Sequence, residues 1–344
     1  MIVGLCGFGC TGASAVLDYL RDYDSIEINE EVELSFIYDP DGFMDLENAI
    51  CLRPVRYYSG DAAIKKFRHI MFSYELVHYM KRVMPIPVYK KLVSDYINGI
   101  SKIRWNGFWH FDKRHYSDFH YWIKYVLGWK YLRVFDKLGL KIPKSFPNNS
   151  IMTIPVSKDV FYNETRTFLS NLLRAMGLNG EKTVIVDQPF PANCPSSVFH
   201  FFEDNCKAIV VVKDPRDMYF FVKDHARLDV NWIPCGSCME FIEFYKHQMS
   251  ICHFDERTLV VNFEDLIYEY ESTTAKICNF IGIEKLSEKG TYFHPERSIG
   301  NTQIYKKHKE CKEEIELIER ELKEYLYPFE KYNVGEIKAK PFVF

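Results

Sequence analysis

The stretch IVGLCGFGCTGASAVLDYL, residues 2–20, decides the fold of this chain. Its apolar beginning, residues 2–6, predicts a buried strand, and AVLDYL at its end predicts a helix. Between them, the glycine-rich turn Gly7–Ser14 can bend tightly, because glycine adopts backbone conformations that other residues avoid. In such a unit, successive backbone N–H groups and the positive end of the helix dipole face the same point. The stretch therefore predicts an α/β protein with an anion-binding loop.

The spacing within this loop is close to that of the phosphate-binding loop of ATPases and kinases. Gly7 and Gly12 have the required separation and Ser14 takes the place of the Ser/Thr, but Ala13 stands where that motif has its phosphate-gripping Lys. This departure disfavours a conventional ATPase or kinase. The loop could still hold a nucleotide 5′-phosphate through backbone N–H groups and hydroxyls. From the loop alone, a structural turn and a dinucleotide site remain open.

Three later runs rich in β-branched residues also predict buried strands, namely Thr183–Val186, Ala208–Val212 and Thr258–Val261. Amphipathic segments of helix length separate them, and this alternation implies a parallel sheet covered on both faces. The interval from about 57 to 180 breaks the alternation with helical, aromatic-rich stretches. We therefore expect a single domain over 1–344, with a three-layer, P-loop-like α/β fold and a helical insertion.

The composition is that of an ordinary globular protein, with 47% hydrophobic and 26% charged residues. The chain has 44 Lys and Arg against 47 Asp and Glu, a formal net charge of −3, so we expect no nucleic-acid partner and only a local anion site. The ten cysteines form no metal-binding pattern, which suits free thiols in a reducing compartment. Neither a basic leader nor an apolar run of membrane-spanning length is present. These features predict a cytoplasmic protein without a transmembrane segment or a metal site.

A second motif, Lys213-Asp214-Pro215-Arg216-Asp217, follows the strand predicted at 208–212. Pro215 is well placed to begin a helix. At the carboxyl end of a parallel strand the two cations would lie beside the glycine loop, which is where α/β sheets bind nucleotides. By itself the motif could equally be a solvated turn with local ion pairs.

Together these segments resemble the sulfotransferases that use 3′-phosphoadenosine 5′-phosphosulfate (PAPS). Three further stretches are similar to segments of that family, namely KTVIVDQPFPAN at 182–193, RTLVVNFEDLIYEYESTTAKICNFIGI at 257–283 and FHPERSIGNTQIYKK at 293–307. The resemblance implies transfer of a sulfuryl group from PAPS to a hydroxyl, with 3′-phosphoadenosine 5′-phosphate (PAP) as the product and no metal required. It leaves the helical insertion unexplained, and we expect that segment to lie on the acceptor side.

The resemblance also implies which residues bind the nucleotide. The 5′-phosphosulfate would lie against the first loop, at Gly9, Cys10, Thr11, Gly12, Ala13 and Ser14. Lys213, with Arg216 nearby, would hold the 3′-phosphate, and a C-terminal loop would close over the nucleotide with Ser298, Asn301, Lys306 and Lys307. Two positions depart from the family pattern, because Cys10 stands where relatives have Lys or Arg and Phe221 stands where they have Ser. These departures keep open a catalytically weak protein that binds PAP or another nucleotide.

A hydroxyl that attacks sulfur must lose its proton, so a carboxylate within hydrogen-bond reach would assist. The segment EINEEVELSFIYDPDGFMDLE at 27–47 resembles the region that carries a Glu base in glycan sulfotransferases, which makes Glu33 the first candidate and Glu31 the second. Alternating Glu residues along a strand also mark a solvent-facing surface. Asp187, at the end of the strand at 183–186, is the other candidate. The expected acceptor is a glycan, with a lipid, sterol or small alcohol as the alternative.

Aromatic and histidine residues gather in the insertion. Trp105, Trp109 and Trp122 could stack on sugar rings or cover a lipid, although aromatic residues at helical spacing usually form a core. Histidines at 110, 115 and 120 show no firm metal-ligand spacing, and we expect them on the surface or in the acceptor cleft.

Overall fold

A computed structural model describes most of the chain and contains a five-stranded parallel sheet. The described residues are 1–56, 58–107, 109, 117–140, 150–203, 205–225, 232–286, 290–332 and 337. The strands follow the order β2-β5-β1-β6-β7, and every neighbouring pair is parallel. Their bounds are β1 Ile2–Gly7, β2 Ile26–Glu33, β5 Thr183–Asp187, β6 Cys206–Val212 and β7 Thr258–Asn262. The predicted α/β class and its strands are confirmed, with ends that shift by one or two residues.

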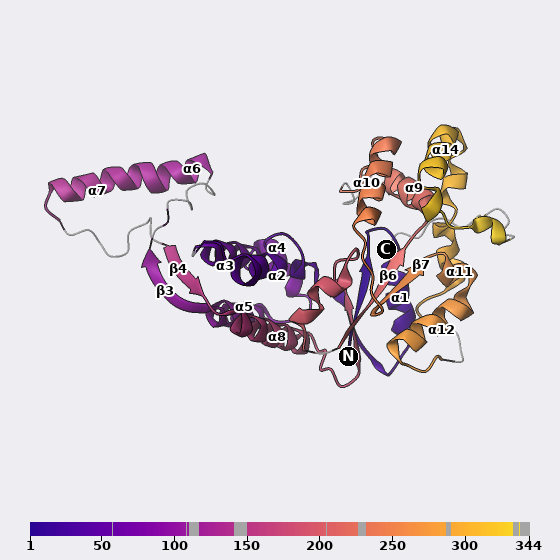
Figure 1. The fold of residues 1–344 in the computed structure, drawn as a ribbon, viewed down its shortest axis with the longest axis horizontal. Coiled ribbons are helices and arrows are strands. Elements are labelled where there is room, and N and C mark those ends of the chain that lie inside the picture. The colour runs from indigo at the N-terminus through magenta and orange to yellow at the C-terminus, as the bar shows by residue number, and fades with distance from the viewer. Residues whose placement is uncertain are drawn as a thin grey trace.

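Helices cover both faces of the sheet, which gives the predicted three layers (Figure 1). In β1, Ile2 and Cys6 point into a core shared with the helical insertion. Val3 and Leu5, which alternate with them, point into a second core formed with α1 (Ala13–Leu20) and α12 (Tyr270–Ile281). Successive strand residues face opposite sides, so a run that is apolar throughout must be covered twice. Burying one large aliphatic side chain in this way contributes about 1.5–3 kcal/mol.

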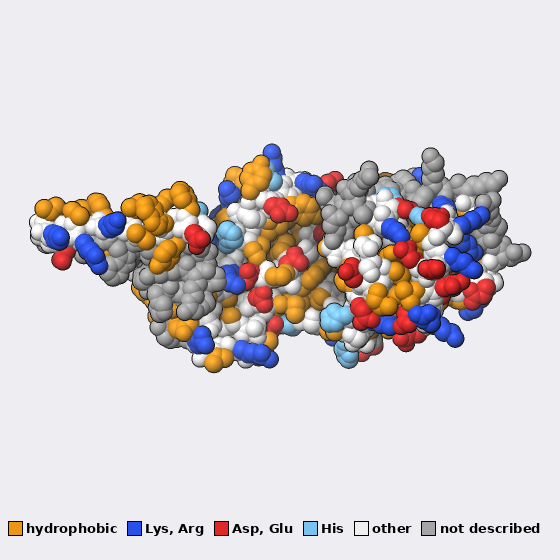
Figure 2. All heavy atoms as spheres, turned by 90° about the horizontal axis from the view of Figure 1, so that it is seen from above, with side chains coloured by type: hydrophobic (Ala, Val, Ile, Leu, Met, Phe, Trp, Pro, Cys, Tyr) orange, Lys and Arg blue, Asp and Glu red, His pale blue; other side chains and the backbone are white. Residues whose placement is uncertain are grey.

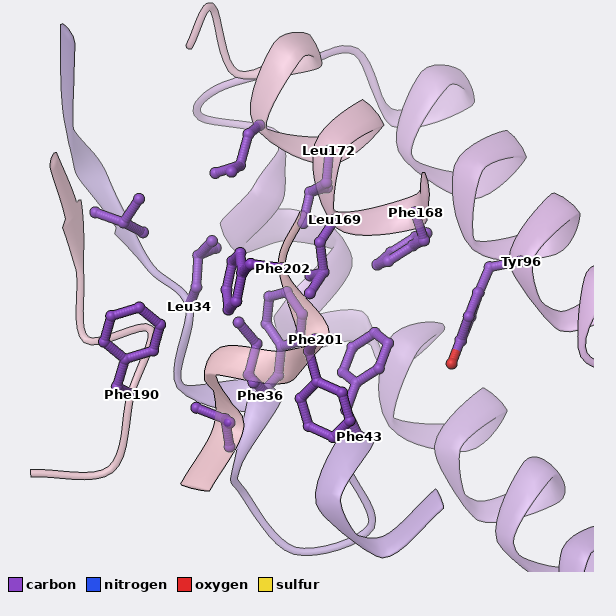
Figure 3. Close-up of a cluster of buried hydrophobic side chains, with 14 of the residues drawn as sticks. Leu34, Phe36, Phe43, Tyr96, Phe168, Leu169, Leu172, Phe190, Phe201 and Phe202 are labelled. Carbon is purple, nitrogen blue, oxygen red and sulfur yellow. The ribbon is translucent and has the colours of Figure 1, made fainter. Parts of the chain in front are cut away.

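The helical part of the insertion packs around an aromatic core. Its elements between β2 and β5 are η1 Ser35–Ile37, α2 Phe43–Glu47, η2 Asn48–Leu52, α3 Ser59–Met71, α4 Tyr74–Met80, α5 Ile86–Gly99 and α8 Lys158–Ala175. Phe43 contacts several aromatic rings of this cluster, part of which Figure 3 shows; its ring centroid lies 4.9 Å from that of Phe67 and 5.4 Å from that of Tyr96. Many of the aromatic residues of the first half of the chain therefore form core.

The far end of the insertion is not purely helical. An antiparallel hairpin, β3 (Ser101–Gly107) with β4 (Ser150–Pro155), extends away from the sheet, and a helical segment lies beyond it (Figure 1). That segment consists of α6 Asp118–Tyr121, the π-helix η4 Trp122–Leu127 and α7 Gly128–Lys137. The helix was predicted from the sequence and the hairpin was not. More than 40 residues of sequence separate the two strands, and most side chains of β3 are exposed. Neither strand therefore appears in the sequence as a buried apolar run, so the pattern did not predict the hairpin.

The C-terminal third builds a third core beside the carboxyl end of the sheet. Its helices are α9 Pro215–His225, α10 Cys238–Ser250, α11 Asp265–Tyr268, α13 Pro295–Ser298 and α14 Lys312–Glu321. Shorter turns are η5 Pro195–Phe201, η6 Ile299–Asn301, η7 Ile304–Lys307, η8 Lys309–Cys311, η9 Lys323–Tyr325 and η10 Phe329–Lys331. Helix α14 is amphipathic and buries Ile318 against this core.

Two further observations concern the whole chain. All ten cysteines are free thiols. Within the described ranges, each helix is too short or too polar to cross a lipid bilayer.

Candidate functional site

The site lies where β5, β1 and β6 end side by side. In the register of β1 and β6, Gly7 is the partner of Val211, so the glycine loop after β1 and Lys213 after β6 leave the sheet at the same edge. Cys10 of the loop and the Lys213 ammonium are close enough to influence each other's charge. The structure therefore brings the two predicted nucleotide motifs together, as the parallel order of the strands requires.

The glycine loop has a left-handed backbone at three positions. The φ angles are +78° at Gly9, +55° at Cys10 and +84° at Gly12. Gly9 and Gly12 adopt this conformation at no steric cost, whereas Cys10 stores about 1–3 kcal/mol of backbone strain. Helix α1 begins at Ala13 without a side-chain cap or an acidic residue in its first turn. Its first N–H groups are therefore oriented to receive an anion.

Two aromatic rings pack directly against Gly9 and Gly12. A Cβ atom added at Gly12 would lie 2.4 Å from the ring of Phe263, and one added at Gly9 would lie 2.2 Å from the ring of Trp232. Trp232 is 58% exposed, so its ring covers the loop while one side remains open to solvent. Sequence reasoning missed this contact, because Trp232 is more than 200 residues from the loop and belongs to no motif.

Thr11 places a buried hydroxyl inside the loop. Its side chain is 3% exposed, and Oγ1 has no hydrogen-bond partner among the residues that the structure describes. Leaving a buried polar atom unpaired costs about 1–3 kcal/mol. An anion bound by the loop could accept a hydrogen bond from this hydroxyl and remove that cost.

Lys213 is a buried cation at the same edge. It is 5% exposed, and its Nζ atom lies 5.1 Å from the ring centroid of Phe221 and 5.2 Å from that of Phe263. No ion pair within 4.0 Å joins it to a carboxylate in the described ranges, and burial lowers the pKa of its ammonium group. A buried ammonium without an ion pair is unfavourable until an anion approaches it. Phe221 thus faces the cation with its ring.

Three carboxyl groups surround this cation at longer range. Glu264 is fully buried, and its Oε1 accepts a hydrogen bond from the Asp214 N–H group at 3.0 Å while Oε2 has no partner in the described ranges. Burial, followed by the charges of Asp214 and Asp217, raises the pKa of Glu264 to about 8. Burial and the charge of Asp214 likewise raise the pKa of Asp217 to about 7. Burial therefore disfavours the ionised forms of Glu264 and Asp217 beside the proposed anion site.

Asp217 also fastens the C-terminal loop. Its Oδ2 accepts a hydrogen bond from the Gln303 N–H group at 2.6 Å and its Oδ1 one from the Tyr305 N–H group at 3.3 Å. Of the predicted residues in this loop, Ser298 and Asn301 are buried, and Lys306 and Lys307 are exposed. The C-terminal loop thus packs against helix α9. Contact between a nucleotide and the four predicted residues of this loop stays a prediction.

Arg216 lies in a different environment from Lys213. Its Nε and Nη2 atoms donate to the two carboxylate oxygens of Asp214 at 3.0 and 2.7 Å, and its Nη1 donates to Glu319 at 2.8 Å. Nη2 also donates to the carbonyl of Tyr327 at 3.2 Å. These bonds connect α9 to α14 and to the segment at Tyr327. Of the two cations in the motif, Arg216 forms ion pairs, whereas Lys213 forms none in the described ranges. A contact between Arg216 and the cofactor stays a prediction.

On the other side of the glycine loop, two carboxylates lie together. A shift of register after Asn29 brings Glu33 of β2 opposite Asp187 of β5. Burial, followed by the charge of Glu33, raises the pKa of Asp187 to about 7. Glu33 is an exposed residue, but protein atoms partly desolvate its carboxylate, and this desolvation, followed by the charge of Asp39, raises the pKa of Glu33. Two carboxyl groups with raised pKa values are suited to accept a proton near neutral pH.

Neighbours hold this pair in place. Tyr79 reaches over from α4, and its Oη accepts a hydrogen bond from the Glu33 N–H group at 2.6 Å. Gln188 follows Asp187 in a left-handed conformation with φ +48°, and its Oε1 accepts a hydrogen bond from the Gly7 N–H group at 3.3 Å. Gln188 therefore connects the carboxylate pair to the glycine loop. Neither Tyr79 nor Gln188 was predicted, because their contacts depend on tertiary packing.

The other sequence candidates lie elsewhere. Glu31 is exposed in the irregular part of β2 and is not the residue that pairs with Asp187. Trp105 and Trp122 are about half exposed in the hairpin and the helix beyond it, and the Trp109 ring lies tilted against the ring of Tyr58, with 4.0 Å between their centroids. His120 contacts Ser117 on the same distant segment, whereas residues 110 and 115 lie outside the described residues.

A group suited to metal binding lies away from this edge. In the described part of the chain, His308, Glu310 and Cys311 place one ligand atom each within 4.8 Å of one another. The Lys223 ammonium lies 3.7 Å from the Cys311 sulfur, and the Asp224 carboxylate lies 3.1 Å from His308 Nε2. Protein groups therefore already satisfy the cluster.

Comparisons with known proteins found matches among solved structures. No model of a protein family and no curated protein matches the chain. The sulfotransferase domain from the Synechococcus PCC 7002 olefin synthase is 11% identical, with a TM-score of 0.38 over 85% of this chain and 78% of that one. The sulfotransferase domain from the curacin biosynthetic pathway is 11% identical, with a TM-score of 0.40 over 89% and 81%. Retinol dehydratase in complex with androsterone and the inactive cofactor PAP is 12% identical, with a TM-score of 0.34 over 97% and 82%. At these identities and TM-scores the likeness carries no argument about the activity or the ligand of this chain.

Proposed function

We propose that this chain is a sulfotransferase, which transfers a sulfuryl group from PAPS to a hydroxyl of an acceptor. The observation that carries the proposal is the order of groups along one edge of the sheet. Strand β5 ends at Asp187, which is paired with Glu33; the glycine loop follows β1, and Lys213 follows β6. These three strands are neighbours in the sheet. A base, an anion cradle and a buried cation thus adjoin one another, as transfer of a charged group to an alcohol requires.

In the proposed reaction, the acceptor oxygen attacks sulfur and the bond between sulfur and the 5′-phosphate oxygen breaks. The Glu33–Asp187 pair takes the hydroxyl proton, and PAP leaves with the electron pair of the broken bond. The loop N–H groups and the Thr11 hydroxyl would hold the phosphate side, and Lys213 would balance its charge. The sulfuryl group carries less charge than a γ-phosphoryl group, so these donors can act without a metal ion.

The departure at Cys10 has a structural counterpart. Relatives carry a cation there, whereas here the Lys213 ammonium acts on Cys10 from the neighbouring strand end. Instead of the contact with the 3′-phosphate that the resemblance implies, we infer that Lys213 supplies the positive charge that the loop itself lacks. The acceptor is proposed to be a glycan, or alternatively a lipid, sterol or small alcohol. The ten free cysteines support a reducing, cytoplasmic location.

A second candidate is a nucleotide-binding protein with little turnover. It is favoured by the ring of Phe221 against Lys213 and by the three carboxyl groups around that cation. Such a protein would bind PAP without transferring sulfate.

Calorimetric titration with PAP, with ATP and NAD as controls and no added metal, tests nucleotide binding. Radiolabelled PAPS with a panel of glycans, sterols and small alcohols then tests transfer. Selective PAP binding with a labelled acceptor would support the sulfotransferase, and PAP binding without any labelled product would support the second candidate. Absence of PAP binding would overturn both.

A further inference from the structure

The helical segment of residues 117–140 stands apart from the site and from the sheet. We call it the arm helix; it comprises Ser117, α6, η4, α7 and the three residues after them. Figure 1 shows it beyond the β3–β4 hairpin, at the opposite end of the molecule from α9 and α14. Its position leaves long stretches of its surface uncovered by the sheet or by the cores.

A continuous apolar stripe runs along the arm helix. Leu127, Tyr131, Val134 and Leu138 follow one another at intervals of four, three and four residues, which places them on one face. They are 42%, 52%, 52% and 65% exposed. Towards the N-terminus the same exposure continues through Phe119, Trp122 and Ile123. Figure 2 shows hydrophobic side chains gathered along one edge of this segment. A surface helix of a globular protein normally buries such a stripe.

Basic residues border the stripe. At 100° per residue, Lys130, Arg133 and Lys137 fall on one flank of the apolar face, and all three are exposed. The helix thus presents an apolar face beside a row of cations, and Asp136 lies on the side opposite the apolar face.

The charge of the surrounding sequence is unlike that of the remainder of the chain. Residues 101–149 contain ten Lys or Arg against three Asp, a net +7. The other residues contain 34 Lys or Arg against 44 Asp or Glu, a net −10. The same short segment also contains four of the five tryptophans. Trp and Tyr are enriched where proteins meet the boundary between lipid and water.

We propose that the arm helix lies flat on the surface of an anionic lipid bilayer, with its apolar stripe among the upper acyl chains and its cations at the headgroups. An apolar face, a Lys/Arg flank and aromatic residues are the features of helices that bind in the plane of a membrane. This inference does not depend on the proposed reaction. It gives the chain a docking surface for a bilayer, held some distance from the nucleotide edge.

Two other occupants fit less well. A second copy packing arm against arm would bring together two helices with four Lys or Arg against two Asp each, a net +2, set in 101–149 segments that each carry +7, and these charges repel each other. A nucleic acid or an acidic glycan would be attracted by the cations, but the aliphatic side chains of Leu127, Val134 and Leu138 offer such a ligand no hydrogen bond. A bilayer with anionic headgroups satisfies both the apolar stripe and the charge.

The test is flotation of the full chain with lipid vesicles. Vesicles of phosphatidylcholine alone are compared with vesicles that also contain phosphatidylglycerol, at low and at high salt. We expect binding to the anionic vesicles that weakens as salt is added, since a cation near an anionic surface is screened.

Two double variants separate the apolar stripe from the cations. Val134→Gln with Leu138→Gln should abolish vesicle binding. Lys130→Gln with Lys137→Gln should weaken binding to anionic vesicles by roughly fivefold for each cation removed. Matched controls on the body are Met239→Gln with Ile251→Gln, which are 48% and 49% exposed, and Lys90→Gln with Lys91→Gln on α5. The controls should bind as the unaltered chain does. All of these side chains are solvent-exposed, so circular dichroism should show every variant folded.

Several outcomes would overturn the proposal. One is no flotation with either kind of vesicle, and another is flotation that the arm variants leave unchanged. A dimer in sedimentation velocity that the Val134/Leu138 variant dissociates, without vesicle binding, would assign the stripe to self-association. Binding to heparin or single-stranded DNA, again without vesicle binding, would assign the cations to a polyanion.

Discussion

Glu33 and Asp187 stand directly opposite each other on the neighbouring parallel strands β2 and β5. Burial, followed by the charge of Glu33, raises the pKa of Asp187 to about 7, and the charge of Glu33 acts there only because the sheet places the two residues together. An aspartate with its ordinary pKa of about 3.9 would bind a proton too weakly at neutral pH to act as an efficient base.

Replacing Asp187 by Asn should therefore lower kcat by about 10²–10⁴, the usual contribution of a positioned base. Binding of PAP should not change, because Asp187 lies outside the glycine loop and the KDPRD motif that are proposed to hold the nucleotide. The measurement is PAP formed from PAPS with an acceptor found in the panel. Glu31→Gln is the control, since Glu31 is exposed and does not pair with Asp187. Full activity of the Asp187→Asn enzyme would remove this carboxylate from the reaction.

The pH profile should show which member of the pair is the base. Because a base must be deprotonated, kcat/KM should rise with pH and level off above about 7, the pKa of Asp187. Glu33→Gln removes a like charge, so the inflection should move to lower pH while turnover persists. If Glu33→Gln instead abolishes turnover at every pH, and Asp187→Asn does not, Glu33 is the base.

Replacing Lys213 by Met tests the buried cation. Met keeps the length of the side chain and loses its charge, so PAP affinity should fall by about 1.5–3 kcal/mol in calorimetry. Without nucleotide the variant should be as stable as the unaltered chain or more so, because an ammonium without an ion pair is removed from the interior. Lys182→Met, at an exposed position just before β5, is the control and should alter neither quantity. Unchanged PAP affinity in the Lys213 variant would exclude this cation from the site.

Gly12→Ala should damage both the fold and nucleotide binding. The new Cβ would meet the Phe263 ring at 2.4 Å in a residue whose φ is +84°. Gly177→Ala separates the two causes, because φ there is +87° and nothing lies within 4 Å of the added atom. The control should lose only about 1–2 kcal/mol of unfolding free energy from backbone strain. Gly12→Ala should lose more in urea denaturation, and equal losses would contradict tight packing of the loop.

Thr11→Val replaces a buried hydroxyl, unpartnered in the described ranges, with a methyl group of similar size. Unfolding free energy without nucleotide should stay constant or rise by about 1 kcal/mol, while PAP affinity falls. Thr165→Val is the contrasting variant, since its hydroxyl donates to the Phe161 carbonyl and contacts the Tyr96 hydroxyl. That variant should be destabilised by about 1–3 kcal/mol. A Thr11→Val chain that binds PAP normally would show that the hydroxyl does not face the ligand.

Glu264 should make stability depend on pH. Its pKa is raised from 4.5 to about 8 in the folded chain, so the folded state binds this proton more tightly than the unfolded state does. The resulting stabilisation is complete below about 4.5 and is lost as the pH rises through about 8. Relative to Glu264→Gln, the unaltered chain should lose at most about 1.4 kcal/mol of unfolding free energy per pH unit over this range. Parallel urea titrations of the two proteins check this, and a constant difference would contradict a buried protonated Glu264.

The sequence by itself determined the elements that local rules specify. Buried strands appear as apolar runs, and Gly9 and Gly12 were recognisable because a tight turn between strand and helix demands glycine. The parallel order of these strands follows from the helices between them, so the position of Lys213 beside the loop was predictable from the chain alone.

Tertiary structure alone decided which side chains act together. The opposition of Glu33 and Asp187 depends on a register shift in β2, and the ring of Trp232 reaches Gly9 from a segment without a motif. Arg216 differs from Lys213 only because Asp214, Glu319 and Tyr327 fold against it, whereas the ammonium meets aromatic rings. The β3–β4 hairpin likewise joins strands that carry no buried apolar run. The physical reason is that apolar pattern and backbone preference act within a few residues, whereas partners in a site are chosen by the packing of distant segments.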